Sequence, residues 1–274
     1  MRFNKAMLVF RKDWIEICRN WQVLMPIIVV PLIFSVVLPL VLTLIPSVTI
    51  SQGGSLGELE VFIENLPIHI EEQLRNFSEP QVMVYIMAVY FLAPLFLIIP
   101  LMASSVIASD SFAGEKERKT IEALLATPIS DEELFFGKML VSFIPSMIVT
   151  IISFIVYSII FDIMTFNLFN GMILLPNIDW ILLIFGLAPT LALASIGLTV
   201  MISVRVKGFR EAQQISVLLL IPILALVFGQ ISGAFILGPY VILALVILFS
   251  IIDFVVFRVG VKLFNREEVL SKLT

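Results

Sequence analysis

The stretch that decides the fold is residues 82–108, VMVYIMAVYFLAPLFLIIPLMASSVIA, which contains no charged side chain. Crossing about 30 Å of hydrocarbon as a helix takes roughly 20 apolar residues, so this stretch is long enough to span a bilayer. In lipid, a helix or a closed barrel satisfies its own backbone hydrogen bonds. Because the stretch is continuously apolar rather than alternating, it predicts a membrane-spanning helix and excludes a barrel strand.

Further apolar stretches on both sides of it meet the same length test. Together they predict six spans, at approximately 23–45, 82–108, 140–161, 180–204, 215–237 and 240–257. The composition agrees, because 60% of the residues are hydrophobic and 14% are charged, whereas soluble domains carry roughly a quarter charged residues. The stretches leave no room for a separate soluble domain, so residues 1–274 are predicted to form one all-α transmembrane domain.

Two connections between the spans carry a prediction of their own. Gly238-Pro239 predicts a tight hairpin between the fifth and sixth spans, and a re-entrant half-helix around residues 229–233 is an alternative there. The external loop 46–81 has apolar residues at near-helical spacing amid acids, which predicts one or two short surface helices.

Basic residues mark one side of the membrane. Apart from Arg75, every Lys and Arg lies before the first stretch, between the second and third, between the fourth and fifth, or at the C-terminal end. Short loops rich in Lys and Arg stay in the cytoplasm. The pattern therefore predicts that both termini and the loop after the second span are cytoplasmic. The single cysteine, Cys18, excludes an internal disulfide.

Residues 1–21 predict an amphipathic helix that lies along the cytoplasmic leaflet. Apolar residues recur there at steps of four and three, at Phe3, Met7, Phe10, Trp14, Ile17 and Trp21. The basic side chains lie off this stripe, as in helices that bind a membrane interface. A soluble helix docked on a partner protein would show the same pattern.

A dense polar segment follows the second span directly, with the sequence DSFAGEKERKTIEALLATPIS at residues 110–130. The pairs Glu115–Lys119 and Arg118–Glu122 have the i,i+4 spacing of ion pairs on a helix. Ile121, Leu124 and Leu125 form an apolar strip, and Pro128 stops the helix. Ser130 and Glu133 predict a capping box for the helix that enters the third span. Taken alone, these charges also fit the solvated face of a connecting helix.

This segment resembles the coupling segment of permease subunits of type-2 ATP-binding-cassette exporters. The pattern of that family is Glu-x-Glu-Arg-Gly-Thr-x-Glu-x-Leu-Leu-x-Thr-Pro-[Ile/Leu]-Ser. The matching residues are Glu115, Glu117, Arg118, Thr120, Glu122, Leu124, Leu125, Thr127, Pro128 and Ser130, followed by Gly137 and Lys138 at the start of the third span. Lys119 departs from the pattern, which has glycine at this position. The departure affects the expected backbone geometry of the turn and not the assignment to the family.

The resemblance implies a cytoplasmic coupling helix, within residues 109–139, that docks with a separate ATPase subunit. The residues implied in coupling are Glu115, Glu117, Arg118, Thr120, Glu122, Leu125 and Pro128. The resemblance also implies two ATPase copies, a second permease subunit, identical or related, and a prokaryotic plasma membrane. ATP and magnesium are expected on the ATPase partner. This chain is expected to bind no cofactor, metal or nucleic acid, to contact membrane lipid, and to have no enzymatic activity by itself.

The residues themselves agree that any ATP hydrolysis takes place on another chain. A phosphate-binding loop of the form Gly-x-x-x-x-Gly-Lys-[Ser/Thr] occurs nowhere in the sequence,. His69 is the single histidine and lies in the external loop beside Glu71 and Glu72. A zinc protease or a histidine-dependent serine hydrolase inside the membrane is therefore excluded.

Asp253 is the one acid well inside a predicted span. An ionisable group in a span is costly and indicates an ion or substrate role by default. Asp253 also lies five residues before Arg258, about 7.5 Å along a helix, so pairing with that arginine or reaching toward the interface is the structural alternative.

Two other functional classes are compatible with six spans. A secondary transporter or channel without an ATPase partner would need inverted repeats, paired broken helices or several buried ionisable groups. The sequence offers Asp253 alone for that role and shows no internal repeat. A membrane subunit that anchors a partner without transporting anything is the third class.

Overall fold

The computed structural model describes residues 3–51, 74, 77–120, 129–206, 208–232 and 234–263. In these ranges the elements are helices joined by turns, and none of them is a strand. The described ranges contain six helices long and apolar enough to cross a membrane, at Trp21–Leu44, Pro80–Glu117, Glu133–Thr165, Ile178–Arg205, Phe209–Ile231 and Pro239–Arg258. The prediction of a helical fold with six candidate spans is confirmed for the described residues. Most of the external loop, with its predicted surface helices, lies outside the described residues.

Most spans consist of several helical pieces, because short π-helical or 3-10 turns interrupt the α-helix. An N-terminal helix, α1 (Phe3–Arg19), precedes the first span, which is α2 (Trp21–Leu32), η1 (Ile33–Val37) and α3 (Leu38–Ser51). The second span is α6 (Glu79–Tyr85), η2 (Ile86–Phe91), α7 (Leu92–Phe96), α8 (Ile98–Ser109), η3 (Asp110–Gly114) and α9 (Glu115–Glu117). The third is α11 (Asp131–Thr165), and the fourth is α12 (Ile178–Leu182), η4 (Leu183–Leu187) and α13 (Ala188–Arg205). The fifth is α14 (Phe209–Ser216), η5 (Val217–Leu220) and α15 (Ile221–Ile231), and the sixth is α16 (Pro239–Leu263).

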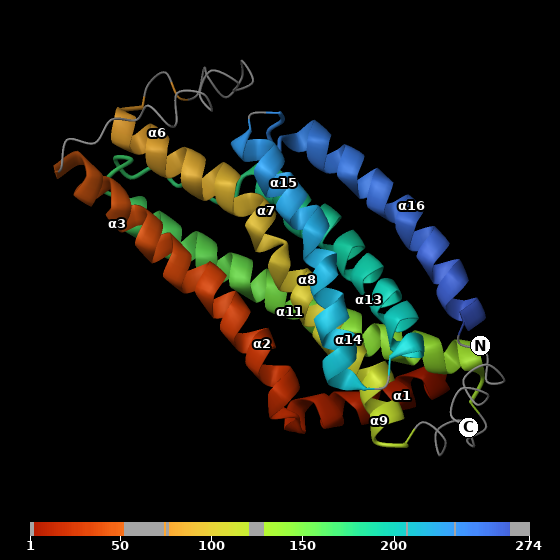
Figure 1. The fold of residues 1–274 in the computed structure, drawn as a ribbon. Coiled ribbons are helices and arrows are strands. Elements are labelled where there is room, and N and C mark those ends of the chain that lie inside the picture. Colours follow the sequence, from red (N-terminus) through yellow and green to blue (C-terminus); the bar gives the residue numbers. More distant parts are fainter. Residues whose placement is uncertain are drawn as a thin grey trace.

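The centre of the bundle is formed by the second, third and fourth spans. Helix α8 packs against both α11 and α13, while α2 packs on α8 and α16 packs on α13. Helix α1 runs across one end of the bundle and packs against α11 (Figure 1). This end, called the α1 end below, also holds α9 and the last described turn of α16 (Figure 1).

An aromatic cluster joins the central spans at the end opposite α1. Trp180 is fully buried, and its ring stacks on Tyr157 and Phe154, with centroids 5.0 and 5.5 Å away. Trp180 Nε1 donates to the Val89 carbonyl at 2.9 Å, and the Tyr157 hydroxyl donates to the Ala88 carbonyl at 2.8 Å. Both carbonyls belong to η2, where the π-helical turn disturbs the regular hydrogen-bond ladder. The cluster therefore completes the backbone hydrogen bonding of the second span with side chains from its neighbours.

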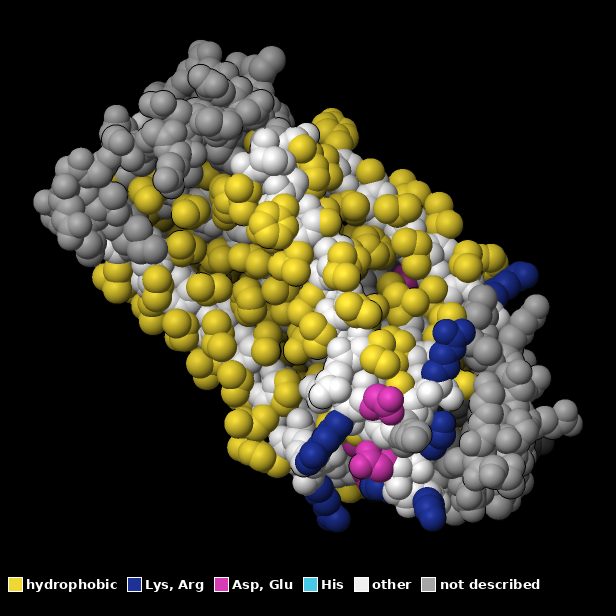
Figure 2. Space-filling view, in the orientation of Figure 1, with side chains coloured by type: hydrophobic (Ala, Val, Ile, Leu, Met, Phe, Trp, Pro, Cys, Tyr) yellow, Lys and Arg dark blue, Asp and Glu magenta, His cyan; other side chains and the backbone are white. Residues whose placement is uncertain are grey.

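Hydrophobic and charged side chains occupy separate parts of the surface, as expected for a protein in a bilayer. On the face shown in Figure 2, hydrophobic side chains cover the spans, and Lys and Arg gather toward the α1 end. More than half of the second and fourth spans is buried inside the protein, whereas less than a quarter of the first, fifth and sixth spans is buried. A surface this apolar is stable in contact with lipid or with another apolar chain.

Three boundaries differ from the sequence-based predictions. The second span does not end at Ala108 but continues as a helix to Glu117, and the third begins at Asp131 rather than Leu140. Both extensions carry charged residues, and Glu115 of the first pairs with Lys138 of the second at the α1 end, as described below. Between the fifth and sixth spans, α15 ends at Ile231 and α16 starts at Pro239, with no re-entrant helix among the residues described there.

Candidate coupling site

The third span begins with the predicted capping box, which the structure confirms. The Ser130 hydroxyl accepts a hydrogen bond from the Glu133 backbone N–H at 3.3 Å, and the Glu133 carboxylate accepts one from the Ser130 N–H at 3.2 Å. This reciprocal pair satisfies two backbone donors and fixes where α11 starts. Lys138 then lies seven residues, or about 10 Å, along the helix from its first residue.

Lys138 is completely buried and lies at the centre of a charged cluster. Its Nζ donates to Glu115 Oε2 at 2.6 Å, to the Ser111 carbonyl at 2.5 Å and to Asp13 Oδ2 at 3.3 Å. Lys12 pairs with the same two acids, contacting Glu115 and lying 3.2 Å from Asp13. We call Lys12, Asp13, Ser111, Glu115 and Lys138 the ionic cluster. It connects α1, η3, α9 and α11.

The ionic cluster is balanced in charge. Its two lysines neutralise its two carboxylates, and the Ser111 hydroxyl donates to Asp13 at 2.7 Å. Burial alone would raise the pKa of Asp13, but Lys138, Lys12 and Ser111 outweigh it and lower that pKa below its usual value. Burial alone would lower the pKa of Lys12, but the Asp13 and Glu115 carboxylates raise it above its usual value. Mutual pairing therefore favours the charged forms of Asp13 and Lys12.

The same cluster contains a set of carboxylates close enough to hold a metal ion. Oxygens of Asp13, Glu16 and Glu115 lie within 4.8 Å of one another. The Lys12 ammonium, however, is already paired with all three, lying 3.4 Å from Glu16. The place of a cation is thus taken by a side chain of the protein itself.

Close packing brings α1 to the cluster. Gly137 lies directly under α1, and a Cβ at this position would approach the Ala6 carbonyl oxygen to 2.7 Å and Val9 Cβ to 2.9 Å. Ala6, Val9, Asp13 and Ile17 are buried and form the face of α1 that meets the bundle. The aromatic stripe predicted to face the membrane is in part exposed, with Met7 and Trp14 among the exposed large side chains.

A second ion pair extends the cluster toward the first span. Arg118 donates to Asp110 Oδ1 at 2.9 Å, and the Asn20 side-chain amide donates to the same oxygen at 3.1 Å. Asn20 also accepts from the Gln22 N–H at 3.1 Å and so caps the start of α2. One carboxylate, Asp110, thereby joins the turn between α1 and α2 to the end of the second span.

Two neighbouring side chains of α9 hold the junction between the fourth and fifth spans. Lys116 donates to the Val206 carbonyl at 3.0 Å, beside the end of α13. Glu117 Oε2 accepts the Phe209 N–H at 2.8 Å, at the start of α14, where negative charge is favourable,. A Cβ at Gly208 would lie 2.5 Å from the Glu117 carboxylate oxygen, so glycine is what permits this approach.

Beyond Glu117 the chain turns at Lys119 in a way that explains the glycine of the family pattern. Lys119 has φ of +56°, in the left-handed region. The Thr120 N–H donates to the Glu115 carbonyl at 3.0 Å, and the Lys119 N–H donates to the Lys116 carbonyl at 3.2 Å. These two bonds make a Schellman motif, which usually has glycine at the left-handed position. Here a lysine occupies that position.

The predicted Glu115–Lys119 ion pair is wrong, for the same reason. The helix ends at Glu117, so residues 115 and 119 do not lie one turn apart on a helix, and Glu115 is instead paired with Lys138 and Lys12. Thr120 is exposed after the turn. Glu122, Leu125 and Pro128, with the apolar strip and the Arg118–Glu122 pair, lie outside the described residues.

The sequence pointed to Glu115, Glu117 and Arg118 but missed their partners. Asp110 looks like an ordinary polar residue at the edge of an apolar stretch, and Asp13 looks like an ordinary polar residue of an amphipathic helix. A usable signal was present in α1, where Asp13 falls in step with the buried residues Ala6, Val9 and Ile17. An acid on the apolar face of a helix indicates a buried cation nearby.

Asp253 lies apart from the ionic cluster, on α16. It is half-buried, and its Oδ1 atom has no hydrogen-bond partner among the described residues. The predicted pairing with Arg258 is not made, because the Arg258 guanidinium lies over the Phe254 ring, 4.8 Å from the centroid.

Six apolar helices around a buried core, with charged side chains joined at one end, define a multi-pass membrane protein. The family model described as ABC-2 family transporter protein matches residues 7–264. The chain therefore belongs to the ABC-2 transporter family, and the resemblance found in the segment after the second span is confirmed. Proteins of this family are membrane permeases that associate in general with an ABC ATPase and are generally not catalytic themselves. No curated protein matches the chain.

Proposed function

We propose that this chain is one permease subunit of an ATP-driven exporter in a prokaryotic plasma membrane. It pairs with a second permease subunit, identical or related, and the translocation path forms between the two six-span bundles. Two ATPase subunits bind the α1 end, which faces the cytoplasm together with both termini, and they carry the ATP and magnesium. Residues 115–128 are the docking segment.

The observation that supports this proposal most strongly is the connectivity of α9. In four residues, Glu115 to Arg118, side chains reach α1, α11, the end of α13 and the start of α14. A protein that pushes on this segment acts directly on the third, fourth and fifth spans. Buried, hydrogen-bonded polar groups resist rearrangement. A displacement of this segment by the ATPase would therefore move the third, fourth and fifth spans together.

Co-purification tests the partnership. We expect the full chain, extracted in mild detergent from cells that produce it with its native ATPase, to retain that ATPase at a stoichiometric level. Mass spectrometry identifies the partner, and reconstitution into vesicles measures ATP-dependent movement of cargo. A secondary carrier would purify alone and would move its cargo without ATP, and an anchoring subunit would retain its partner without moving anything.

A charge reversal tests the docking segment. Arg118→Glu is expected to leave membrane insertion intact and to lower ATP hydrolysis by the assembled complex, since Arg118 connects the segment to Asp110. Arg205→Glu is the matched control, because Arg205 is an exposed arginine at the end of α13. Equal loss of ATPase activity in both variants would count against a specific role for the segment.

A further inference from the structure

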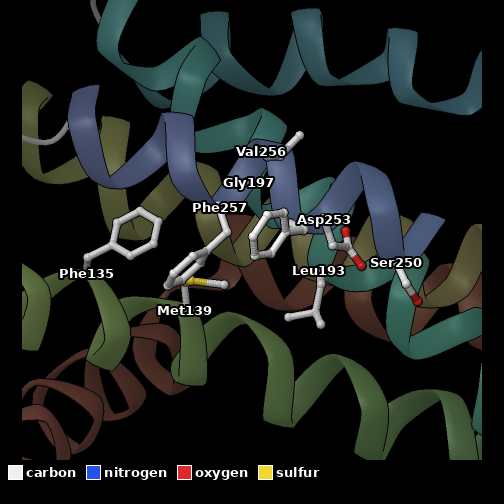
Figure 3. A pocket seen from close by; sticks show the side chains of 9 residues that line it. Phe135, Met139, Leu193, Gly197, Ser250, Asp253, Val256 and Phe257 are labelled. Carbon is white, nitrogen blue, oxygen red and sulfur yellow. The ribbon is translucent and has the colours of Figure 1, made fainter. Parts of the chain in front are cut away.

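A groove of about 310 Å³ lies between α11, α13 and α16, toward the α1 end of the bundle (Figure 3). Its walls are mostly apolar. They are formed by Phe135 and Met139 of α11, Leu193 and Gly197 of α13, and Ser250, Asp253, Phe254, Val256 and Phe257 of α16. Steps of three and four along α16 place Ser250, Asp253 and Phe257 on one face of that helix. Figure 3 shows this face opposite Met139 and Leu193.

The groove holds one carboxylate oxygen that no donor of the described residues satisfies. The Oδ1 atom of Asp253 is buried without a hydrogen-bond partner in the described part of the chain. The nearby polar groups are engaged elsewhere, because the Ser250 hydroxyl donates to the Val246 carbonyl at 2.7 Å and Arg258 lies over Phe254. A buried carboxylate oxygen without a partner is costly. The groove is therefore complementary to a positive charge.

The rest of the groove is suited to apolar and aromatic groups. Phe254 and Phe257 are 61% and 45% exposed, so the groove opens outward between α16 and its neighbours. Phe135 packs edge-on against Phe257, with centroids 5.8 Å apart. Aromatic faces attract cations, most strongly where water is scarce. The volume is at the lower end of the range for small-molecule sites, roughly 300–1,000 Å³.

We infer that this groove binds a hydrophobic monovalent cation, such as an organic ammonium or phosphonium, whose charge pairs with Asp253. The apolar substituents of the ligand lie against Met139, Leu193 and the phenylalanine rings. The inference names a class of cargo and so rests on the proposed function for its role in transport. Binding itself needs the permease alone and is tested on it.

The test measures binding of radiolabelled tetraphenylphosphonium to the purified full chain in phosphatidylcholine nanodiscs. We expect saturable binding to the native chain and a loss of affinity of about tenfold or more in Asp253→Asn, because a charge-assisted contact is removed. Asp162→Asn is the matched control. Asp162 is another half-buried acid, at the far end of α11, and its carboxylate is satisfied by the Leu174 and Leu175 N–H groups at 3.0 and 3.2 Å.

Two further measurements keep the inference falsifiable. Leu193→Trp fills the groove without changing its charge, so it should also weaken binding, even if the asparagine variant folds poorly. Tetraphenylborate has the same shape and the opposite charge, and in a separate measurement without the cation it should show no saturable binding. Undiminished affinity in Asp253→Asn, or equal binding of the anion, overturns the inference, and undiminished affinity in Leu193→Trp shows that the cation does not bind in this groove. Intact binding without ATP-driven transport in the assembled complex would instead contradict the proposed function and leave the groove assigned.

Discussion

Replacing Lys138 by methionine should destabilise the protein by about 3–5 kcal/mol, the usual cost of removing one partner from a buried ion pair. Lys138 is fully buried and donates to Asp13 and Glu115. Without it, Lys12 is the single cation left in the cluster beside two buried carboxylates. Methionine is similar in length and unbranched, so the loss reflects charge and hydrogen bonding more than packing volume.

A double-mutant cycle separates the pairing from other effects. Asp13→Asn in the Lys138→Met background leaves Lys12 with Glu115 and restores the charge balance, so the double variant should lose about 1–3 kcal/mol less than the sum of the single variants. Unfolding of the full chain by a denaturing detergent, followed by circular dichroism, measures each variant. Lys119→Met is the exposed control. Additive single effects, or a Lys138→Met variant within about 0.5 kcal/mol of the native chain, would refute the reasoning.

Four further predictions follow from the α1 end. Lys119→Gly should raise the free energy of unfolding by about 0.5–1 kcal/mol by relieving the left-handed residue, whereas Lys119→Ala should not. Gly137→Ala should lower it by about 1–3 kcal/mol through the clash with α1 and speed tryptic cleavage within α1, while Gly238→Ala, with nothing within 4 Å of its Cβ, should be close to neutral,. Folding lowers the pKa of Asp13, so the contribution of this carboxylate to stability is present above about pH 4 and is lost as the pH falls through the pKa of the folded state,. Asp13→Asn should therefore make the free energy of unfolding less dependent on pH in the acid range. Identical pH dependence of the two proteins in that range would contradict this. Glu117→Ala should speed hydrogen exchange at the Phe209 amide, and Glu117→Gln, which keeps the acceptor oxygen, should not,.

The six spans could be predicted from the sequence because they depend on local quantities. A stretch such as 82–108 is recognisable by length and composition alone, since the bilayer sets both. The capping box at Ser130 and Glu133 is equally local, as it involves residues three positions apart. The glycine of the family pattern also reflects local geometry, because the residue at this position, Lys119, has a left-handed backbone conformation.

The partners in the ionic cluster and those of Glu117 could not be predicted, because they are distant in the sequence. Lys138 and Asp13 are separated by 125 positions, and Glu117 and Phe209 by 92. Spacing within one segment suggested a pair between Glu115 and Lys119 instead. Burial decided otherwise, since Glu115 points into the bundle where two lysines converge, and a surface pair contributes little in comparison.

The length of the second span has a mechanical consequence. From Pro80 to Glu117 it comprises 38 residues, about 57 Å of helix at 1.5 Å per residue, nearly twice the thickness of the hydrocarbon. The end of this span, which bears Glu115 and leads into Arg118, therefore extends well beyond the length that is needed to cross the hydrocarbon. Under the proposed function, force applied at this end would pass along the span through the π-helical turns η3 and η2. Asp110, held by Arg118 and Asn20, fastens this end of the span to the start of the first span.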